Sequence, residues 1–358
     1  MNKISTRQLY FFLACVAPVG KLVVLPSVLA GSAKNDMLWP ILIQYLVQAA
    51  VIFAVLLLTK RGLNLFELLE NTFGKIAARI LIAVFTAFLF YAALLPLLEQ
   101  KLFVQAVFYD TLPSLIAFSP FFVFSAYLCA KALGSFGRTW DILGPLAIAG
   151  LVGILILSVT NADYGALLPV GASGVSGIFN ATAQASSWFF DSAIVLTLLG
   201  KIDYKKGIAW KGALFYLLGG LGILIFLATF YGVFEGTALN QIFAFAKTSK
   251  YFSGITVLGR VDYAFIYTLA LVLLFYSVLP LQCGIDCIIQ AYGKKKYLPT
   301  ILSVIVNVVF LTLSILLDYR FGDVLQAVSK TVFWIFPVFT VLLPPLCLLL
   351  RRVSRERT

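Results

Sequence analysis

The fold is decided by the stretch Val16-Ala17-Pro18-Val19-Gly20-Lys21-Leu22-Val23-Val24-Leu25-Pro26, in the middle of an apolar run from Leu9 to Gly31. Proline lacks a backbone donor and glycine lacks a side chain. We therefore expect two half-helices joined by unwound backbone near Pro18 to Gly20. Lys21 follows at once, about 12 residues from one end of the run and 10 from the other. Roughly 15 Å of helix on each side is too far for its side chain to reach water.

A lysine at this depth needs a partner. A cation near the bilayer midplane costs about 2.5–3.5 kcal/mol and normally faces a cavity or a counter-charge. Unwound backbone at membrane depth is tolerated mainly where it lines a cavity. Two interpretations stay open: Lys21 belongs to a structural ion pair, or it forms a ligand or ion site together with Pro18, Val19 and Gly20.

The composition is that of a polytopic helical membrane protein. The 358 residues are 61% hydrophobic and 12% charged, with a mean hydropathy of +1.00, whereas a soluble domain is about 25% charged. Histidine is absent, which removes the commonest general base and metal ligand. We therefore expect no enzyme activity, no metal and no cofactor. The five cysteines lie in apolar runs and are interpreted as packing residues.

Hydrophobic runs predict ten membrane spans in one transmembrane domain, residues 1–358. The expected spans are 8–31, 38–59, 76–109, 114–133, 139–160, 178–200, 209–234, 257–289, 297–318 and 326–350. The segment Leu63 to Phe73 carries apolar and acidic side chains on opposite faces, which predicts a helix lying in the membrane interface. The segment Leu239 to Lys247 is apolar and aromatic, and we expect it to dip back toward the bundle as a short lid.

The basic residues orient the bundle. With a cytoplasmic N-terminus, 19 Lys and Arg residues fall in cytoplasmic loops and 7 outside, in addition to Lys21 within the first span. This bias predicts that both termini are cytoplasmic.

Ten spans divide into two halves of five. The third and eighth spans each carry a proline about 20 residues in, Pro96 and Pro280. An odd number of spans in each half forces the second half to run in the opposite direction. We therefore expect a leucine-transporter-like five-plus-five inverted repeat, with a first repeat of about 8–160, a second of about 178–350, and breaks in helices 1 and 6.

In such a repeat the sixth span is the counterpart of the first, and it carries Asp191 near its midpoint. Two opposite charges at similar depth on these helices form a natural pair, so we predict that Asp191 pairs with Lys21. Gln184, Ser186 and Ser187 add hydrogen-bonding groups one turn away. The alternative is that the serines only satisfy neighbouring carbonyls and that Asp191 only neutralises Lys21.

Other charges in or near the spans are interpreted as interfacial ion pairs. They are Glu99 with Lys101, Arg260 with Asp262, and the carboxylates Asp141 and Asp286 near the cytoplasmic ends.

Several short motifs resemble the B subunits of spore nutrient-germinant receptors, a family of the amino acid–polyamine–organocation transporter superfamily. They are Ile4-Ser5-Thr6-Arg7-Gln8-Leu9, Val24-Leu25-Pro26, Asn64-Leu65-Phe66-Glu67-Leu68-Leu69-Glu70, the stretch Asp163 to Pro169, Phe189-Phe190-Asp191 and Arg260-Val261-Asp262-Tyr263-Ala264-Phe265. Their order and spacing extend over essentially the whole chain.

The resemblance implies a ten-helix transporter fold in the inner membrane of a bacterial spore, assembled with an A and a C subunit. It also implies the sensing of a small nutrient such as an amino acid. The chain departs from the family in two ways. Serines occupy the sixth helix where a helix-breaking Pro or Gly is usual, and Asp191 stands where a glutamate is usual.

Three functions therefore compete, of which one, a purely structural scaffold, would need no site at all. A receptor subunit would bind a nutrient at the bilayer midplane, taking its carboxylate on backbone N–H groups after Gly20 and its amine on the sixth helix. A proton- or cation-coupled amino acid transporter would use the same cavity, with Lys21 and Asp191 titrating during the cycle. The sequence predicts no nucleic-acid partner.

Overall fold

The computed structural model describes residues 3–108, 113–250, 262–293, 297–317, 320–332 and 335–347. Within these ranges the regular elements are helical, apart from an isolated β-bridge between Ile4 and Ile202.

The first apolar run is broken as predicted. It consists of α1 (Thr6–Phe11), a π-helical turn (Phe12–Val16), α2 (Ala17–Val19) and α3 (Leu25–Ser32). The non-helical backbone runs from Gly20 to Val24, slightly later than expected. Pro18 does not end the helix, because it falls in the first turn of α2, where a missing N–H is tolerated.

The sixth run is broken too, although its middle contains neither Pro nor Gly. Helix α9 (Gly174–Ala185) ends in a 3₁₀ turn (Ser186–Trp188), and α10 (Asp191–Thr197) begins after two non-helical phenylalanines. Both members of the predicted charge pair therefore lie at helix interruptions.

Six helices in the described residues are long and apolar enough to cross a membrane, so the chain is a multi-pass membrane protein. They contain α4 (Leu38–Leu58), α6 (Lys75–Phe108), α8 (Phe136–Ser158), α11 (Ile208–Phe234), α13 (Asp262–Tyr292) and α14 (Leu298–Leu316). Two shorter apolar helices are α7 (Ser114–Cys129) and residues 335–347, which include α16 (Ile335–Pro337) and a π-helical turn (Val338–Leu342).

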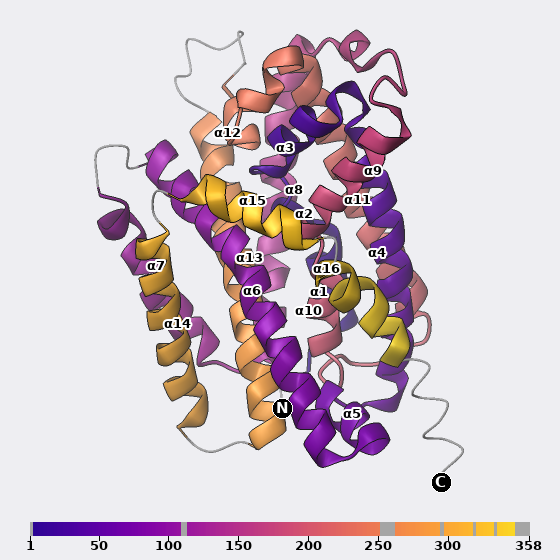
Figure 1. Cartoon of the computed structure of the whole chain (residues 1–358), viewed down its shortest axis with the longest axis vertical. Helices are drawn as coiled ribbons and strands as arrows, with labels where there is room; N and C mark the ends of the chain where they lie inside the picture. The colour runs from indigo at the N-terminus through magenta and orange to yellow at the C-terminus, as the bar shows by residue number, and fades with distance from the viewer. Residues whose placement is uncertain are drawn as a thin grey trace.

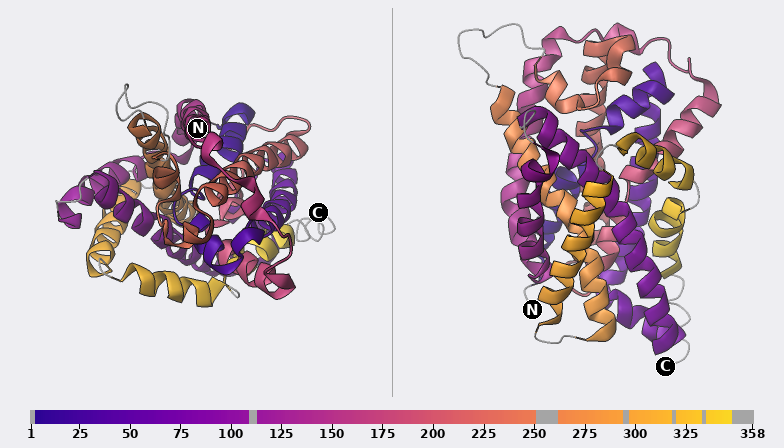
Figure 2. Two further views of the ribbon diagram at one scale, coloured as in Figure 1. Left: turned by 90° about the horizontal axis from the view of Figure 1, so that it is seen from above. Right: turned by 60° about the vertical axis from the view of Figure 1, so that its left-hand side comes forward.

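The long helices pack in pairs taken from the two halves of the chain (Figures 1 and 2). Helix α4 packs against α11, α6 against α13, and α7 against α14. Pro96 in α6 and Pro280 in α13 lie inside their helices. The Ser277 hydroxyl on α13 lies 2.9 Å from the Leu273 carbonyl of its own helix and 3.3 Å from the Pro96 carbonyl of α6, so the two helices approach closely at Pro96.

Short helices cover the two ends of the bundle (Figure 1). At one end is α5 (Leu65–Phe73), the expected interfacial helix, which begins at a capping box formed by Asn64 and Glu67. At the other end is α12 (Ala244–Thr248), within the segment expected to dip inward. Its Ala244 and Phe245 N–H groups donate to the Val23 and Leu22 carbonyls at 2.9 and 3.2 Å. The lid therefore supplies donors to the break in the first run.

The predicted span 326–350 is wrong in its first part. Residues up to Val332 belong to α15 (Phe321–Val332), which lies crosswise over the long helices (Figure 1). Asp323 and Gln326 are exposed on α15, whereas Val328 is buried. A helix with one polar and one apolar face lies along a surface more readily than it spans a membrane.

The close approach of Gly20 to Tyr276 predicts the effect of Gly20→Val. A Cβ at Gly20 would overlap the Tyr276 ring, whereas a Cβ at Gly236 would meet nothing within 4 Å. Overpacking of a buried contact costs about 1–3 kcal/mol. We expect Gly20→Val to lower the thermal midpoint and the monodisperse yield of the purified protein, and Gly236→Val to leave both unchanged. Equal behaviour of the two variants would contradict the close packing.

Candidate functional site

A buried ion pair joins the two broken runs. The Lys21 Nζ atom lies 2.7 Å from Asp191 Oδ2, and both side chains are 0% exposed. The ammonium also donates to the Ala17 carbonyl at 3.0 Å. The predicted pairing of Lys21 with Asp191 is thus confirmed by the geometry.

Two tyrosines complete the surroundings of Asp191. The Tyr216 hydroxyl on α11 donates to Oδ2 at 2.8 Å, and the Tyr276 hydroxyl on α13 is 3.3 Å from Oδ1. Lys21 Nζ also lies 5.0 Å from the centroid of the Phe189 ring and 5.6 Å from that of Tyr276. Aromatic faces attract a cation at such distances. The pair is therefore solvated by the protein itself.

The sequence explains why the chain breaks where the pair forms. At the first break, Gly20 leaves room for the Tyr276 ring. At the second break, the Ser186 hydroxyl donates to the Ala183 carbonyl at 2.6 Å, and that of Ser187 to the Gln184 carbonyl at 3.0 Å. Serine hydroxyls that bond back to the preceding turn compete with helix continuation. The serines thus satisfy neighbouring carbonyls in this structure.

The remaining candidate residues are distributed over two cavities. Pro18 and Val19 line an apolar cavity of about 180 Å³ that is also lined by α8 and α11. Gln184 and Ser187 line a second cavity, of about 230 Å³, together with Trp188, Val28 of α3 and three residues of α15. The structure therefore brings Lys21 and Asp191 together, but it does not gather all the candidate residues around one cavity.

The interpretation of Glu99 as an interfacial ion-pair partner of Lys101 is wrong. Glu99 is 0% exposed, and its Oε1 accepts the Trp188 indole N–H at 2.7 Å. The Lys101 ammonium donates to the Ser314 carbonyl at 2.5 Å. Helix α6 has 34 residues, more than a straight crossing of the bilayer needs, so the position of Glu99 along the helix is a poor guide to which side chains surround it.

Asp141 and Asp286 do form ion pairs, as predicted. Asp141 Oδ1 is 3.1 Å from Arg7 Nε, and Asp286 pairs with Lys201. Of the predicted pair between Arg260 and Asp262, Arg260 lies outside the described residues.

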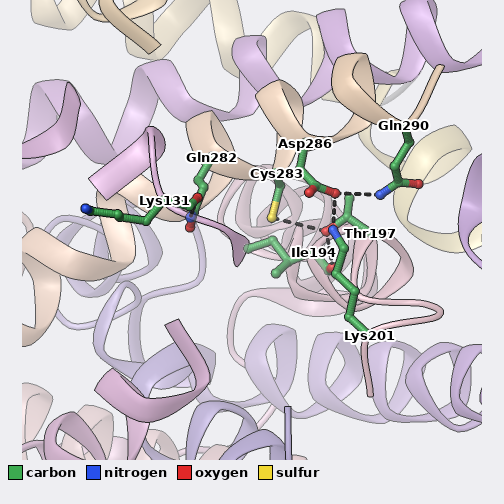
Figure 3. Close-up of polar contacts among 8 residues, drawn as sticks. All are labelled: Lys131, Ile194, Thr197, Lys201, Gln282, Cys283, Asp286 and Gln290. Carbon is green, nitrogen blue, oxygen red and sulfur yellow. Dashed lines mark hydrogen bonds and ion pairs between the residues drawn. The ribbon is translucent and has the colours of Figure 1, made fainter. Parts of the chain in front are cut away.

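Lys201 and Asp286 belong to a polar cluster that joins the segment after α10 to α13 (Figure 3). Gln290 donates to Asp286 Oδ2 at 2.5 Å, and the Thr197 hydroxyl lies 3.1 Å from Cys283 Sγ. Gln282 donates to the carbonyls of Leu128 and Lys131 at the end of α7. Helix α10 is thus held by the ion pair of Asp191 at its start and by the ion pair of Lys201 just after its end.

Sequence reasoning missed Tyr216, Tyr276 and Trp188, and it misread Glu99. The three aromatic residues gave no signal, because aromatic residues make up 15% of the chain. Glu99 did give a signal, as a carboxylate inside an apolar run, but its depth could not be read. Among the described residues no group of three or more His, Cys, Asp or Glu side chains could hold a metal ion.

Comparison with known proteins supports a transporter fold. The family described as spore germination protein matches residues 3–322. None of the curated proteins matches the chain. Among solved structures, the manganese transporter of Eremococcus coleocola bound to an aromatic bis-isothiourea substituted compound is similar, with 14% identity and a TM-score of 0.55 over 95% of this chain and 78% of that chain. A mutant of that transporter gives 11% identity and a TM-score of 0.59 over the same shares. Such identities show a shared fold alone.

The ion pair predicts a double-variant test of stability. Lys21→Met alone leaves the Asp191 carboxylate buried without its counter-charge, and Asp191→Asn alone does the same to the Lys21 ammonium, each at a cost of about 3–5 kcal/mol. The two substitutions together leave no unpaired buried charge. Asparagine keeps a carbonyl oxygen for the Tyr216 and Tyr276 hydroxyls. We expect low abundance and a lowered thermal midpoint for each single variant, and recovery of most of both in the double variant. Additive losses would show that the two groups do not act as a pair.

Proposed function

This chain belongs to the spore germination protein family, and we propose that it is a transporter-like membrane subunit of a spore germinant receptor. In this proposal it binds a small nutrient, an amino acid, near the bilayer midplane and triggers germination. The single observation that carries the proposal is the buried pair of Lys21 and Asp191 at two facing helix breaks. Broken helices at membrane depth are the usual setting of a transporter's substrate site.

We propose ten spans arranged as a five-plus-five inverted repeat. The broken first and sixth runs would be spans 1 and 6, and residues 335–347 would begin span 10. Support comes from the packing of α4 on α11, α6 on α13 and α7 on α14. These are spans 2 with 7, 3 with 8 and 4 with 9, the neighbours that a pseudo-twofold axis between two halves would bring together.

The size of the cavity beside Gln184 and Ser187 favours a small ligand. Its volume of about 230 Å³ equals the liquid volume of about eight water molecules. An amino acid is of this size, whereas a nucleotide is too large. Backbone N–H groups of the non-helical segment after Gly20 would take the ligand carboxylate. Those of Lys21 and Leu22 would first have to leave the Pro18 and Val19 carbonyls, to which they donate at 2.9 and 3.1 Å.

The alternative is a proton- or cation-coupled amino acid transporter. The similarity to a solved transporter shows a fold that both functions would use. The Lys21 ammonium weighs against coupling to a free metal cation, because a covalently attached cation already neutralises Asp191. The receptor reading also proposes A and C subunits as partners and the spore inner membrane as location, in line with the family.

Uptake and response measured separately distinguish the two functions. We expect vesicles containing only this chain to take up no labelled amino acid above empty vesicles. In spores, deletion of the partner A subunit should lower the abundance of this chain and abolish the amino acid response. Robust uptake by the isolated chain would favour the transporter, and a response that survives the deletion would rule out the proposed complex.

The basic-residue bias predicts the orientation. With both termini cytoplasmic, single cysteines at Lys3 and Lys205 should react with a membrane-impermeant maleimide only after the membrane is opened. A cysteine at Glu235, at the opposite end, should react in intact cells. The background for these variants is a chain in which the five native cysteines are replaced by serine or alanine. If the Lys205→Cys and Glu235→Cys variants were labelled from the same side of the membrane, the proposed orientation would be contradicted.

A further inference from the structure

Glu99 is a buried carboxyl group whose hydrogen bonding is incomplete. Its side chain lies on α6 with 0% exposure, and Oε1 accepts the indole N–H of Trp188. Oε2 is buried and has no hydrogen-bond partner. A buried carboxylate oxygen without a donor is costly and calls for an explanation.

Asp191, the other carboxylate in this part of the bundle, is fully engaged. It accepts hydrogen bonds from the Lys21 ammonium and from the hydroxyls of Tyr216 and Tyr276. Its negative charge is balanced by Lys21. A ligand ammonium has nothing to gain at Asp191 unless it first displaces Lys21, whereas Glu99 offers an acceptor oxygen that no cation occupies.

Trp188 connects Glu99 to the cavity of about 230 Å³. This residue lines the cavity beside Gln184 and Ser187, and its indole N–H bonds to Glu99. Trp188 is also part of the 3₁₀ turn that interrupts the sixth run, which is a less regular backbone than the helices around it. A shift of this turn would open Glu99 to the cavity.

We propose that Glu99 is the carboxylate that receives the ammonium group of the ligand, and that the Trp188 indole N–H is the donor bound to this carboxylate when no ligand is present. The ligand class is a small amino acid or primary amine with an apolar side chain. Val28, Trp188 and Leu325 supply apolar groups to the cavity, and Gln184, Ser187 and Gln326 supply polar groups for the backbone part of the ligand. The bond from ammonium to carboxylate is charge-assisted and stronger than a neutral indole bond, and it would give Oε2 the partner that it lacks. This inference rests on the proposed nutrient-binding function and names the residue that recognises the amine.

The test uses the purified full chain in lipid nanodiscs and one matched pair of ligands at a time. The probes are each proteinogenic L-amino acid and its N-acetyl derivative, which lacks the ammonium group. Ligand binding is read as the rise in thermal midpoint across a concentration series. We expect at least one apolar amino acid to stabilise the wild-type chain and its N-acetyl derivative to have no effect.

Glu99→Gln separates recognition from structure. Glutamine keeps an oxygen that accepts the Trp188 N–H, so the midpoint without ligand should stay within error of the wild type. The apparent affinity for the amino acid should fall at least tenfold. Glu70→Gln on α5 is the matched control and should change neither quantity. Trp188→Phe removes the competing donor but keeps the ring, so we expect binding that is as tight as in the wild type or tighter.

Three results would overturn the inference. The first is an unchanged amino acid affinity in Glu99→Gln, and the second is equal stabilisation of the wild-type chain by the N-acetyl derivative. The third is a Trp188→Phe variant that loses binding and also has a lowered thermal midpoint, because a purely structural contact would give both effects. If the wild-type chain bound no amino acid at all, the proposed function would fail as well. Binding that is intact in Glu99→Gln but lost in a Lys21 or Asp191 variant would reject Glu99 alone.

Discussion

The ion pair between Lys21 and Asp191 is the constraint on which the rest of the structure depends. Two charges without access to water are tolerated only if each is paired and further hydrogen-bonded. The protein meets this requirement with groups from four segments: the Ala17 carbonyl, the Phe189 ring, and the hydroxyls of Tyr216 and Tyr276. The first and sixth runs, α11 and α13 must therefore converge on one point, and this fixes the centre of the bundle.

The same requirement links the two helix breaks to α12, the short helix that forms the lid at one end of the bundle. Interrupting a helix inside a membrane frees backbone groups that must find partners. At the first break, the carbonyls of Leu22 and Val23 accept N–H groups from α12. At the second break, the Ser186 and Ser187 hydroxyls bond back to the preceding turn. The lid is thus part of the broken helix's hydrogen bonding, and moving it away would expose the carbonyls beside Lys21.

How much of this could be read from the sequence depends on the residue type. A charge inside an apolar run is rare, so Lys21 and Asp191 could be identified and paired by depth alone. The first break was visible as Pro and Gly, but its shift to Gly20–Val24 was not, since it depends on the π-helical turn before Pro18. Tyr216, Tyr276 and Trp188 could not be distinguished from the other aromatic residues, because their roles depend on long-range contacts. The burial of Glu99 and its bond to Trp188 follow from how α6 packs within the bundle.

The position of α10 suggests how an event at the breaks would spread. This helix is short, and it is bound to α13 near both ends: Asp191 accepts from Tyr276, and Lys201 pairs with Asp286. Because Tyr276 and Asp286 lie on the same helix, α10 cannot turn relative to α13 without breaking a buried polar contact at one end. Cores with such discrete contacts switch between arrangements and do not deform continuously. Movement of the adjoining 3₁₀ turn at Ser186–Trp188 would therefore break at least one of these two contacts unless α10 and α13 move together. A binding event at the centre would in this way reach the end of the bundle where Lys201 lies.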